Sequence, residues 1–463
     1  MDAHWDARQT AAALPLAALA DRLDGDVAAP GEETYADARR VWNGMVNEYP
    51  AAVAYCETDA DVGAAVEFAR THDVPISVRS GGHSVAGASV VSGGLVVDCS
   101  RMNWVRVNPD EQTARVGAGA TWNEVDRATQ SFGLATPGGV VSDTGVAGLT
   151  LGGGTGYLSP KHGFTADNLR AVDVVTGTAD AVTASDRERE DLFWAARGGG
   201  TPGVVTAFEF DLHELAHDVV HVESWVPAAS AREALREYRA YQRTAPDDAC
   251  VSPYYATVPA TADVPSEHHG DVALVLAGVY AGDPAAGRRE FERFADHPAA
   301  FTASLEVLPY AEVQTMFDDD FPAGRRYYWK SVPVTDLTDR AIDVLHDAAA
   351  TAPSSLSTVV VWPMHGAVER VPADETPVVG RDASVVLNVE AAWDDPETTS
   401  ANVEWVRETC GRLRDAAAIP GTLPNFAGGD GPDADDVYAD HADRLRAVRD
   451  RYDPDGVFTY ERE

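Results

Sequence analysis

The chain has 463 residues, of which 74 are acidic and 36 are basic, so its formal net charge is −38 at pH 7. Such an acidic surface repels nucleic acids and anionic membranes, whose binding needs clustered Lys and Arg side chains. Only two lysines occur, Lys161 and Lys330, while arginine is retained, which predicts a halophile's protein that needs salt to screen its own charge.

The N-terminus and the cysteines indicate the compartment. Residues 1–6 carry acidic side chains where a secretory signal peptide would need positive charge, and no run of 18 apolar residues predicts a transmembrane helix. The four cysteines are scattered, which argues against a zinc site and gives no disulfide framework. We therefore expect a cytoplasmic protein, either a monomer or a small homo-oligomer.

A β-α-β unit follows an N-terminal helical segment (residues 1–46). Val53–Cys56 reads as a strand. Thr58 and Asp61 form a helix start, because the hydroxyl can cap the first turn, and the helix is expected to reach about Arg70. Pro75–Arg79 is the next strand and leads directly into a glycine-rich loop.

Two glycine-rich stretches, Ser80–Ser84 and Thr144–Tyr157, dominate the first half of the chain. Glycine lets the backbone approach a ligand closely and lets consecutive N–H groups point at an anion. Two such loops in one domain can hold a pyrophosphate from both sides, with His83 presented to the ligand. Taken alone, Ser80–Ser84 is equally well read as a tight turn with a solvent-facing histidine.

The second half of the chain has a different character, and Val204–Leu212 is read as the last strand of the first domain. From about residue 217, long strands alternate with amphipathic helices and the glycine clusters stop, which predicts an α+β layer architecture. The expected strands are Asp271–Tyr280, Ser357–Trp362 and Ser384–Trp393, and the expected helices are Ala231–Arg243, Asp336–Ala350 and Val403–Ala416.

Several other chemistries lack their motifs. The glycine run starting at Gly152 has Tyr157 where a Rossmann fingerprint needs its last glycine. Neither lysine follows a glycine as in a phosphate-binding loop, and no Gly-x-Ser-x-Gly nucleophile elbow occurs. Glu267–His269 is better read as a solvated loop than as metal ligands, so we predict no metal site.

An ordered set of motifs resembles a known family over nearly the whole chain. The motifs are Arg79–Ser84, Gly117–Trp122, Gly133–Gly139, Leu151–Gly156, His162–Leu169, Asp191–Gly200 and Arg451–Pro454. Together they are similar to the berberine-bridge-enzyme-like flavoproteins of the vanillyl-alcohol-oxidase / p-cresol-methylhydroxylase superfamily. The resemblance implies an FAD-binding domain at residues 47–214. It also implies a substrate domain at 215–420, whose antiparallel sheet, backed by helices, roofs the flavin, and a segment at 421–463 that returns to the first domain.

The resemblance also implies a covalent FAD cofactor. His83 stands at the family's attachment position, where an imidazole nitrogen bonds the flavin 8α-methyl carbon. The other implied cofactor-binding residues are Arg79, Ser80, Gly81, Gly82, Ser84, Thr144, Gly145, Gly148, Gly152, Gly153, Gly154, Gly156, Tyr157, Asp167, Asn168, Val205 and Asn425. Many members add a second link through a cysteine, but the corresponding residue here is Val141, so no second link is expected.

The catalytic base is where the chain departs furthest from the family. A family tyrosine that deprotonates the substrate is replaced by Leu423, two residues before Asn425, which could still hold the substrate or the flavin edge. Alternation along Ser384–Trp393 puts Asn388 and Glu390 on the less apolar face, which is expected to look down on the flavin, so Glu390 is the leading candidate. Tyr328 and Lys330, which share a face of their own strand, form the next candidate pair.

The expected activity is oxidation of an alcohol of the sugar, polyol or secondary-metabolite class by hydride transfer to FAD, with oxygen as the electron acceptor. Thr144 stands where family members tune oxygen access, so a dehydrogenase with another acceptor remains open. An oxidative-cyclisation enzyme and a flavin-binding protein that has lost catalysis are further alternatives.

Overall fold

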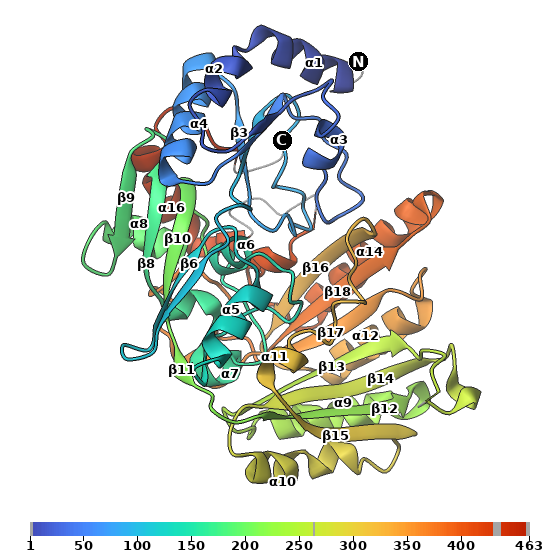
Figure 1. The fold of residues 1–463 in the computed structure, drawn as a ribbon. Helices are drawn as coiled ribbons and strands as arrows, with labels where there is room; N and C mark the ends of the chain where they lie inside the picture. Colours follow the sequence, from blue (N-terminus) through green and yellow to red (C-terminus); the bar gives the residue numbers. More distant parts are fainter. Residues whose placement is uncertain (1–2, 263, 429–436, 460–463) are drawn as a thin grey trace.

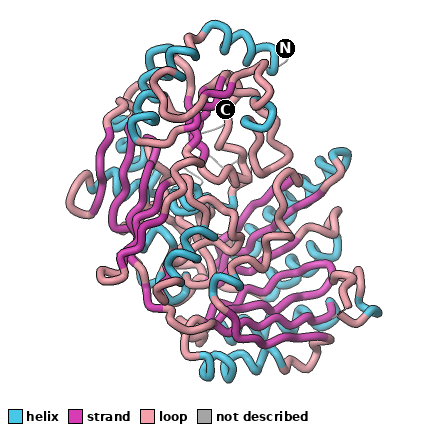
Figure 2. The backbone as a smooth tube through the Cα atoms, viewed as in Figure 1, coloured by secondary structure: helices cyan, strands magenta, loops and turns pink. Residues whose placement is uncertain are grey.

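The structure is a computed structural model that describes residues 3–262, 264–428 and 437–459 (Figure 1). Strands in this part of the chain form sheets of four, five, two and seven members. Figure 2 separates these strands from the helices that cover them. The predicted α+β architecture is confirmed.

The first sheet contains the strand that leads to the histidine loop. Its order is β1-β2-β4-β3, with β2, β4 and β3 parallel. Helix α4 begins after Thr58, whose hydroxyl accepts a hydrogen bond from the Asp61 amide, as the capping pattern predicts. The strands are β1 (Val27–Ala28), β2 (Ala52–Tyr55), β3 (Ile76–Arg79) and β4 (Leu95–Asp98), and the helices nearby are α1 (Ala3–Ala13), α2 (Leu16–Ala20), α3 (Tyr35–Ala38) and α4 (Asp59–His72).

The second sheet is antiparallel and has the order β5-β6-β10-β8-β9. A capping box at Thr121 and Glu124 opens helix α5, again as predicted. The elements of this part are β5 (Val105–Asn108), β6 (Thr113–Gly117), α5 (Trp122–Gln130), β7 (Leu134–Ala135), α6 (Val146–Leu151), α7 (Ser159–His162), η1 (Thr165–Asn168), β8 (Leu169–Thr176), β9 (Ala181–Ser185), α8 (Glu190–Ala196), β10 (Gly203–Asp211) and β11 (His213–Glu214).

The seven-stranded sheet, called the roof sheet below, is antiparallel and has the order β15-β12-β14-β13-β17-β18-β16. Its strands are β12 (Val219–Pro227), β13 (Ala249–Thr257), β14 (Val272–Tyr280), β15 (Thr302–Leu308), β16 (Arg326–Val334), β17 (Thr358–Pro363) and β18 (Val385–Trp393). The main helices that cover it are α9 (Ala228–Gln242), α10 (Pro284–Ala295), α12 (Asp339–Thr351) and α14 (Thr399–Ala417) (Figure 1). Shorter helices are η2 (Ser266–His268), α11 (Tyr310–Val313), α13 (Ala367–Arg370) and η3 (Pro396–Thr398).

The two faces of the roof sheet pack against different layers. Val389 and Ala391 of β18 join a core with residues of α9, α12 and α14. Ala392 of the same strand and Tyr327 of β16 instead pack against Trp42 and Val85 of the first domain. Alternate residues of each strand therefore face the helices or the first domain, as the period of two requires.

The segment after the roof sheet returns to the first domain, as the resemblance implies. After η4 (Pro424–Phe426) and η5 (Ala439–His441), helix α16 (Ala442–Tyr452) packs on α8. Phe458 then forms a parallel bridge with Ile76 of β3, and the Thr459 amide donates to the Ile76 carbonyl. In the described ranges, no helix is both long enough and apolar enough to span a membrane.

Candidate active site and flavin cradle

The two glycine-rich stretches meet at Gly81 and Gly145. A Cβ added to Gly81 would lie 2.6 Å from the backbone nitrogen of Gly145, and one added to Gly145 would lie 2.5 Å from that of Gly81. Separations this short are not tolerated between a side chain and a backbone, so both positions need glycine. The contact holds the loop that carries His83 against the loop before α6.

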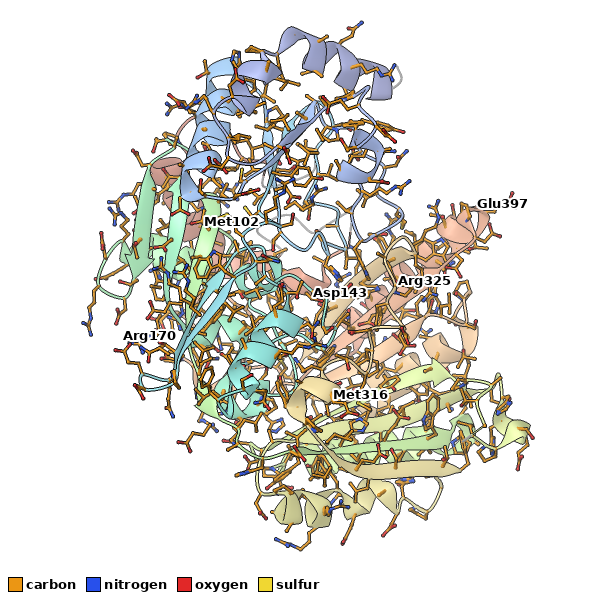
Figure 3. The ribbon with its side chains drawn as sticks, in the orientation of Figure 1. Met102, Asp143, Arg170, Met316, Arg325 and Glu397 are labelled. Atoms are coloured by element: carbon orange, nitrogen blue, oxygen red, sulfur yellow. The ribbon has the colours of Figure 1, made fainter. Side chains whose placement is uncertain are left out.

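His83 lies between an indole ring and a carboxylate. Its ring stacks on Trp42 with centroids 5.2 Å apart, and Trp42 in turn stacks on Tyr327 of the roof sheet at 3.7 Å. The Nε2 atom of His83 lies 3.3 Å from Oδ1 of Asp143, and this contact lowers the pKa of the Asp143 carboxyl. Figure 3 shows Asp143 at the junction of the first domain with the roof sheet.

A cavity of about 220 Å³ opens beside the histidine loop, between the four-stranded and the five-stranded sheet. Small and apolar side chains dominate its wall, which leaves room for a ligand close to the backbone. Its lining comprises Ile76, Val78, Ser80, Ala88, Cys99, Ala118, Ala147, Leu151, Gly200, Thr201, Gly203, Val205, Phe458 and Thr459. Ser80 and Val205, both expected to bind the cofactor, therefore line one cavity.

The histidine loop fits an anionic cofactor. Within the described ranges, the amides of residues 81–84 donate to no backbone carbonyl or side chain, and Gly82 has a φ of +71°. Consecutive unpaired amides in such a turn favour the binding of an anion. The loop therefore offers amide donors that fit the pyrophosphate of FAD, next to the cavity and to His83.

Several predicted cofactor ligands instead have structural contacts. The buried guanidinium of Arg79 forms an ion pair with Asp98 and donates to the Ala38 carbonyl. The Ser84 hydroxyl accepts a hydrogen bond from the Ala88 amide within its own loop. Tyr157 is buried in a core that includes residues of β12, β13 and β14, and burial raises the pKa of its phenol.

The glycines of residues 152–156 likewise pack against protein. Added Cβ atoms at Gly152, Gly153, Gly154 and Gly156 would meet Asn425, Val378, Thr165 and Gly138, respectively. These contacts explain the four glycines without a ligand. In helix α6, which precedes these glycines, Ala147 and Leu151 line the cavity. Nothing lies within 4 Å of a Cβ added to Gly148 of the same helix.

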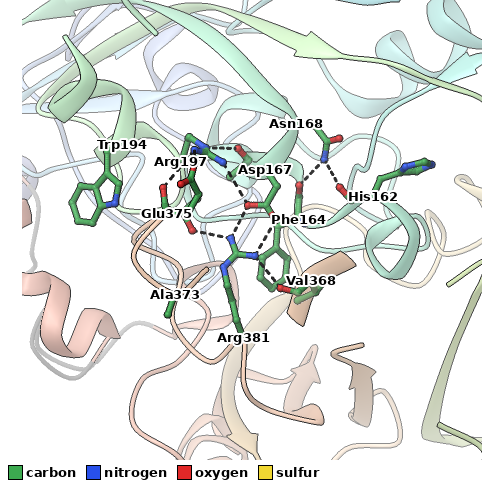
Figure 4. A network of polar contacts seen from close by, with 12 residues as sticks. His162, Phe164, Asp167, Asn168, Trp194, Arg197, Val368, Ala373, Glu375 and Arg381 are labelled. Carbon is green, nitrogen blue, oxygen red and sulfur yellow. Dashed lines mark hydrogen bonds and ion pairs between the residues drawn. The ribbon is translucent and has the colours of Figure 1, made fainter. Parts of the chain in front are cut away.

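Asp167 and Asn168, also expected at the cofactor, tie elements of the protein together. Both carboxylate oxygens of Asp167 accept from Arg381, at 2.9 and 2.6 Å, and Oδ2 also accepts from the Phe164 amide (Figure 4). The Asn168 amide donates to the carbonyls of His162 and Phe164. The polar groups of both side chains are thus engaged with the protein, and their contact with the cofactor stays a prediction.

Glu390 occupies the face of the roof sheet that looks toward the first domain. Its carboxylate accepts from Thr358 Oγ1 at 2.9 Å and from Asn388 Nδ2 at 2.6 Å. Burial raises the pKa of Glu390 to about 7, although both hydrogen bonds oppose that shift. Trp329 of β16 pairs with Glu390 in register.

Tyr328 and Lys330 lie on the opposite face of the roof sheet from Glu390. This corrects the expectation that they are the next candidates for the catalytic base. Tyr328 belongs to the core beneath the helices, and Arg407 of α14 donates from Nε to its hydroxyl at 3.2 Å. The Nζ atom of Lys330 lies 5.7 Å from the centre of the Tyr328 ring. Their parity in β16 places both side chains against the helix layer.

Asn425 acts as a tether within the protein. Its Oδ1 accepts from the Gly154 amide at 3.0 Å, and its Nδ2 donates to the Leu149 carbonyl at 3.1 Å. These bonds hold η4 against α6 and use the groups that were expected to contact substrate. Leu423, in the position of the family tyrosine, is buried with Phe164 and Trp362.

Sequence reasoning missed three residues of this site. Trp42, Asp143 and Thr358 contact His83 or Glu390 from distant parts of the chain. No local motif marks any of them. Only the register of β17 with β18, which pairs Thr358 with Glu390, would have indicated Thr358.

Known proteins resemble this chain over its whole length. A family model described as an FAD binding domain matches residues 50–185. The FAD-linked oxidoreductase pgmH of Aspergillus terreus is 30% identical over 98% of this chain and 97% of its own. A BBE-like enzyme of Physcomitrella patens has a TM-score of 0.86 at 25% identity over 96% of this chain and 98% of its own.

A second solved structure, 6-hydroxy-D-nicotine oxidase from Arthrobacter nicotinovorans, has a TM-score of 0.84 at 26% identity and covers 95% of this chain and 97% of its own. Identity and coverage of this order, with a shared fold and a fitting flavin cradle, establish the relationship. The chain therefore belongs to the FAD-linked oxidoreductases of the p-cresol-methylhydroxylase type, together with the berberine-bridge-enzyme-like enzymes.

Proposed function

We propose that the protein oxidises an alcohol of the sugar, polyol or secondary-metabolite class, with FAD attached covalently through His83 and with oxygen as the electron acceptor. When bound, FAD accepts a hydride at N5 from the carbon that bears the hydroxyl group. In this proposal the chain supplies the cradle at residues 80–84, the attachment residue and a base.

The environment of Glu390 carries the proposal. A carboxyl group whose pKa lies near 7 is poised to take a proton at neutral pH, since a general base works best when its pKa is close to the operating pH. The donors Asn388 and Thr358 fix both oxygens and stabilise the carboxylate form. Glu390 would take the hydroxyl proton as the hydride leaves.

The assignment of oxygen as acceptor is supported by family membership, since one solved relative is named an oxidase. The attachment through His83 is supported by its place in the loop with four available amides, and by Trp42, which holds the imidazole ring in one plane. The proposal includes no second link through a cysteine, because Val141 stands at that position.

The test is anaerobic mixing of the purified protein with a panel of sugars, polyols and phenols while flavin absorbance is followed. Bleaching by an alcohol, recovery of the colour with oxygen and formation of a carbonyl product would support the proposal. Bleaching without recovery would indicate a dehydrogenase, and a cyclised product would indicate oxidative cyclisation. A flavin that no member of a broad panel bleaches would favour a protein that binds FAD without turnover.

Attachment is tested separately. Acid-precipitated wild-type protein should stay yellow, whereas the His83→Ala variant should lose its colour to the supernatant. A yellow precipitate from His83→Ala would show that another residue carries the flavin.

A further inference from the structure

Asp143 and His83 are brought together by the contact between the two glycine loops. His83 follows Gly81 by two residues, and Asp143 precedes Gly145 by two residues. Because Gly81 and Gly145 are in backbone contact, the two side chains start from neighbouring positions on adjacent loops. The distance of 3.3 Å between Nε2 and Oδ1 follows from this arrangement.

The backbone on both sides of Asp143 is anchored. The amide and the hydroxyl of Ser142 donate to the carboxylate of Asp318, at 2.8 and 2.7 Å. On the other side, the Thr144 carbonyl accepts from the Trp122 amide at 3.1 Å. Although the Asp143 side chain is 60% exposed, its backbone is thus held in place on both sides, beside the loop that carries His83.

The two ring nitrogens of His83 have different surroundings. Nε2 faces the Asp143 carboxylate, while no polar group of the described chain contacts Nδ1. A carboxylate accepts hydrogen bonds and cannot donate them, so it favours the tautomer with its proton on Nε2. In that tautomer the Nδ1 lone pair is available for bond formation.

We propose that Asp143 is the positioning residue for flavin attachment, holding the His83 imidazole with the proton on Nε2 and the lone pair of Nδ1 toward the 8α-methyl carbon. This inference rests on the proposed covalent link through His83. It assigns Asp143 a role before catalysis begins, in the maturation of the protein.

The attachment step balances as follows. A bond forms between Nδ1 and the 8α carbon, and one C–H bond of the methyl group breaks with loss of its proton. The electron pair of that C–H bond reduces the isoalloxazine ring by two electrons, and molecular oxygen reoxidises it to give hydrogen peroxide. Positive charge develops on the imidazole as Nδ1 bonds to carbon, and the Asp143 carboxylate stabilises that charge. The methyl proton and the Nε2 proton pass to solvent, and the two protons of hydrogen peroxide are taken up from it.

The test measures FAD affinity and attachment rate separately. Full-length chain from riboflavin-depleted cells is mixed with FAD; binding is followed by flavin fluorescence, and attachment by the flavin retained after acid precipitation at timed intervals. We expect Asp143→Asn to bind FAD within about twofold of wild type but to attach it ~10²-fold more slowly, as for the loss of one preorganised group that stabilises developing charge. The matched control Asp110→Asn removes one exposed negative charge on the β5–β6 turn and should leave both quantities unchanged.

Attachment by Asp143→Asn at the wild-type rate would overturn the proposal. Loss of FAD affinity and attachment together would also overturn it, because Asp143 would then maintain the loop and not the imidazole. Retained colour in His83→Ala would instead refute the link on which the inference rests, so the two failures are distinguishable. If the flavin-free chain is insoluble, each variant is expressed for a short time in cells supplied with riboflavin. The fraction of chains that keep flavin after acid precipitation is then compared between Asp143→Asn and wild type.

Discussion

At the scale of single residues, the charge of Glu390 depends directly on the burial of its side chain. It is 5% exposed, and burial raises its pKa to about 7. If Glu390 is the base, flavin reduction by a substrate found in the panel should slow about tenfold per pH unit below pH 7, because only the deprotonated form accepts a proton. Stopped-flow measurements should also give a rate ~10²–10⁴-fold lower in Glu390→Gln. A rate within a few-fold of wild type would mean that another group is the base.

The same raised pKa predicts a stability effect that needs no substrate. Between pH 4.5 and 7 the folded protein keeps the Glu390 proton while the unfolded chain has lost it, so the contribution of this group to stability falls as pH rises. The full shift corresponds to about 3 kcal/mol. The Tm of Glu390→Gln relative to wild type should therefore increase from pH 5 to pH 8. A constant difference would contradict a buried Glu390 with a raised pKa.

Strand alternation could predict that Asn388 and Glu390 share a face, because that parity is local. It could also group Tyr328 with Lys330. It could not predict which set of alternate β16 residues faces the first domain, because that depends on the register between β16 and β18. In the structure Trp329, and not Tyr328, pairs with Glu390. The roles of Arg79 and Asp167 were missed for a related reason. Their partners Asp98 and Arg381 lie 19 and 214 residues away in sequence.

At the scale of elements, the contact between the histidine loop and the loop before α6 depends on Gly81. In Gly81→Ala the new Cβ would collide with backbone atoms of Gly145, which cannot rotate away as a side chain can. We expect loss of ~1–3 kcal/mol of stability, as for overpacking elsewhere, and a lower FAD content. Gly411→Ala in α14 is the matched control, because nothing lies within 4 Å of its new Cβ and alanine favours helix. Equal behaviour of the two variants in thermal melts would contradict the contact.

The ion pair between Asp167 of η1 and Arg381, in the connection before β18, joins the first domain to the roof domain. Both side chains are about 5% exposed, and they form two hydrogen bonds. Arg381→Ala leaves a buried carboxylate without its main partner, so the free energy of unfolding should fall by ~3–5 kcal/mol in urea titrations. The exposed pair Arg40–Asp37 provides the control, and Arg40→Ala should cost less than about 1 kcal/mol. Similar losses in both variants would show that the buried Asp167–Arg381 pair stabilises the fold no more than an exposed pair does.

At the scale of the whole molecule, the net charge of −38 is expected to make stability depend on salt. Like charges repel within a Debye length, which is ~30 Å at 0.01 M salt and ~3 Å at 1 M. We expect the Tm to rise strongly between these conditions in potassium chloride. Sucrose, which favours the folded state without screening charge, should not reproduce the full effect. A Tm that does not change with salt would contradict self-repulsion as a major destabilising term.

The architecture was more predictable than the site. Capping patterns at Thr58 and Thr121, and the long alternating strands β14, β17 and β18, depend on neighbouring residues and were expected close to their observed bounds. The order of strands in the sheets depends on long-range pairing. Thus β4 lies between β2 and β3, and the simple β-α-β unit expected from the sequence does not have adjacent strands.

The bridge between Phe458 and Ile76 has a consequence for biosynthesis. Phe458 and Thr459 form part of the wall of the flavin cavity, while most of that wall comes from residues 76–205. On the ribosome, the intervening roof domain must be synthesised before these last wall residues emerge. The complete cavity therefore forms only after the roof domain has been synthesised, so its closure is a late event of folding.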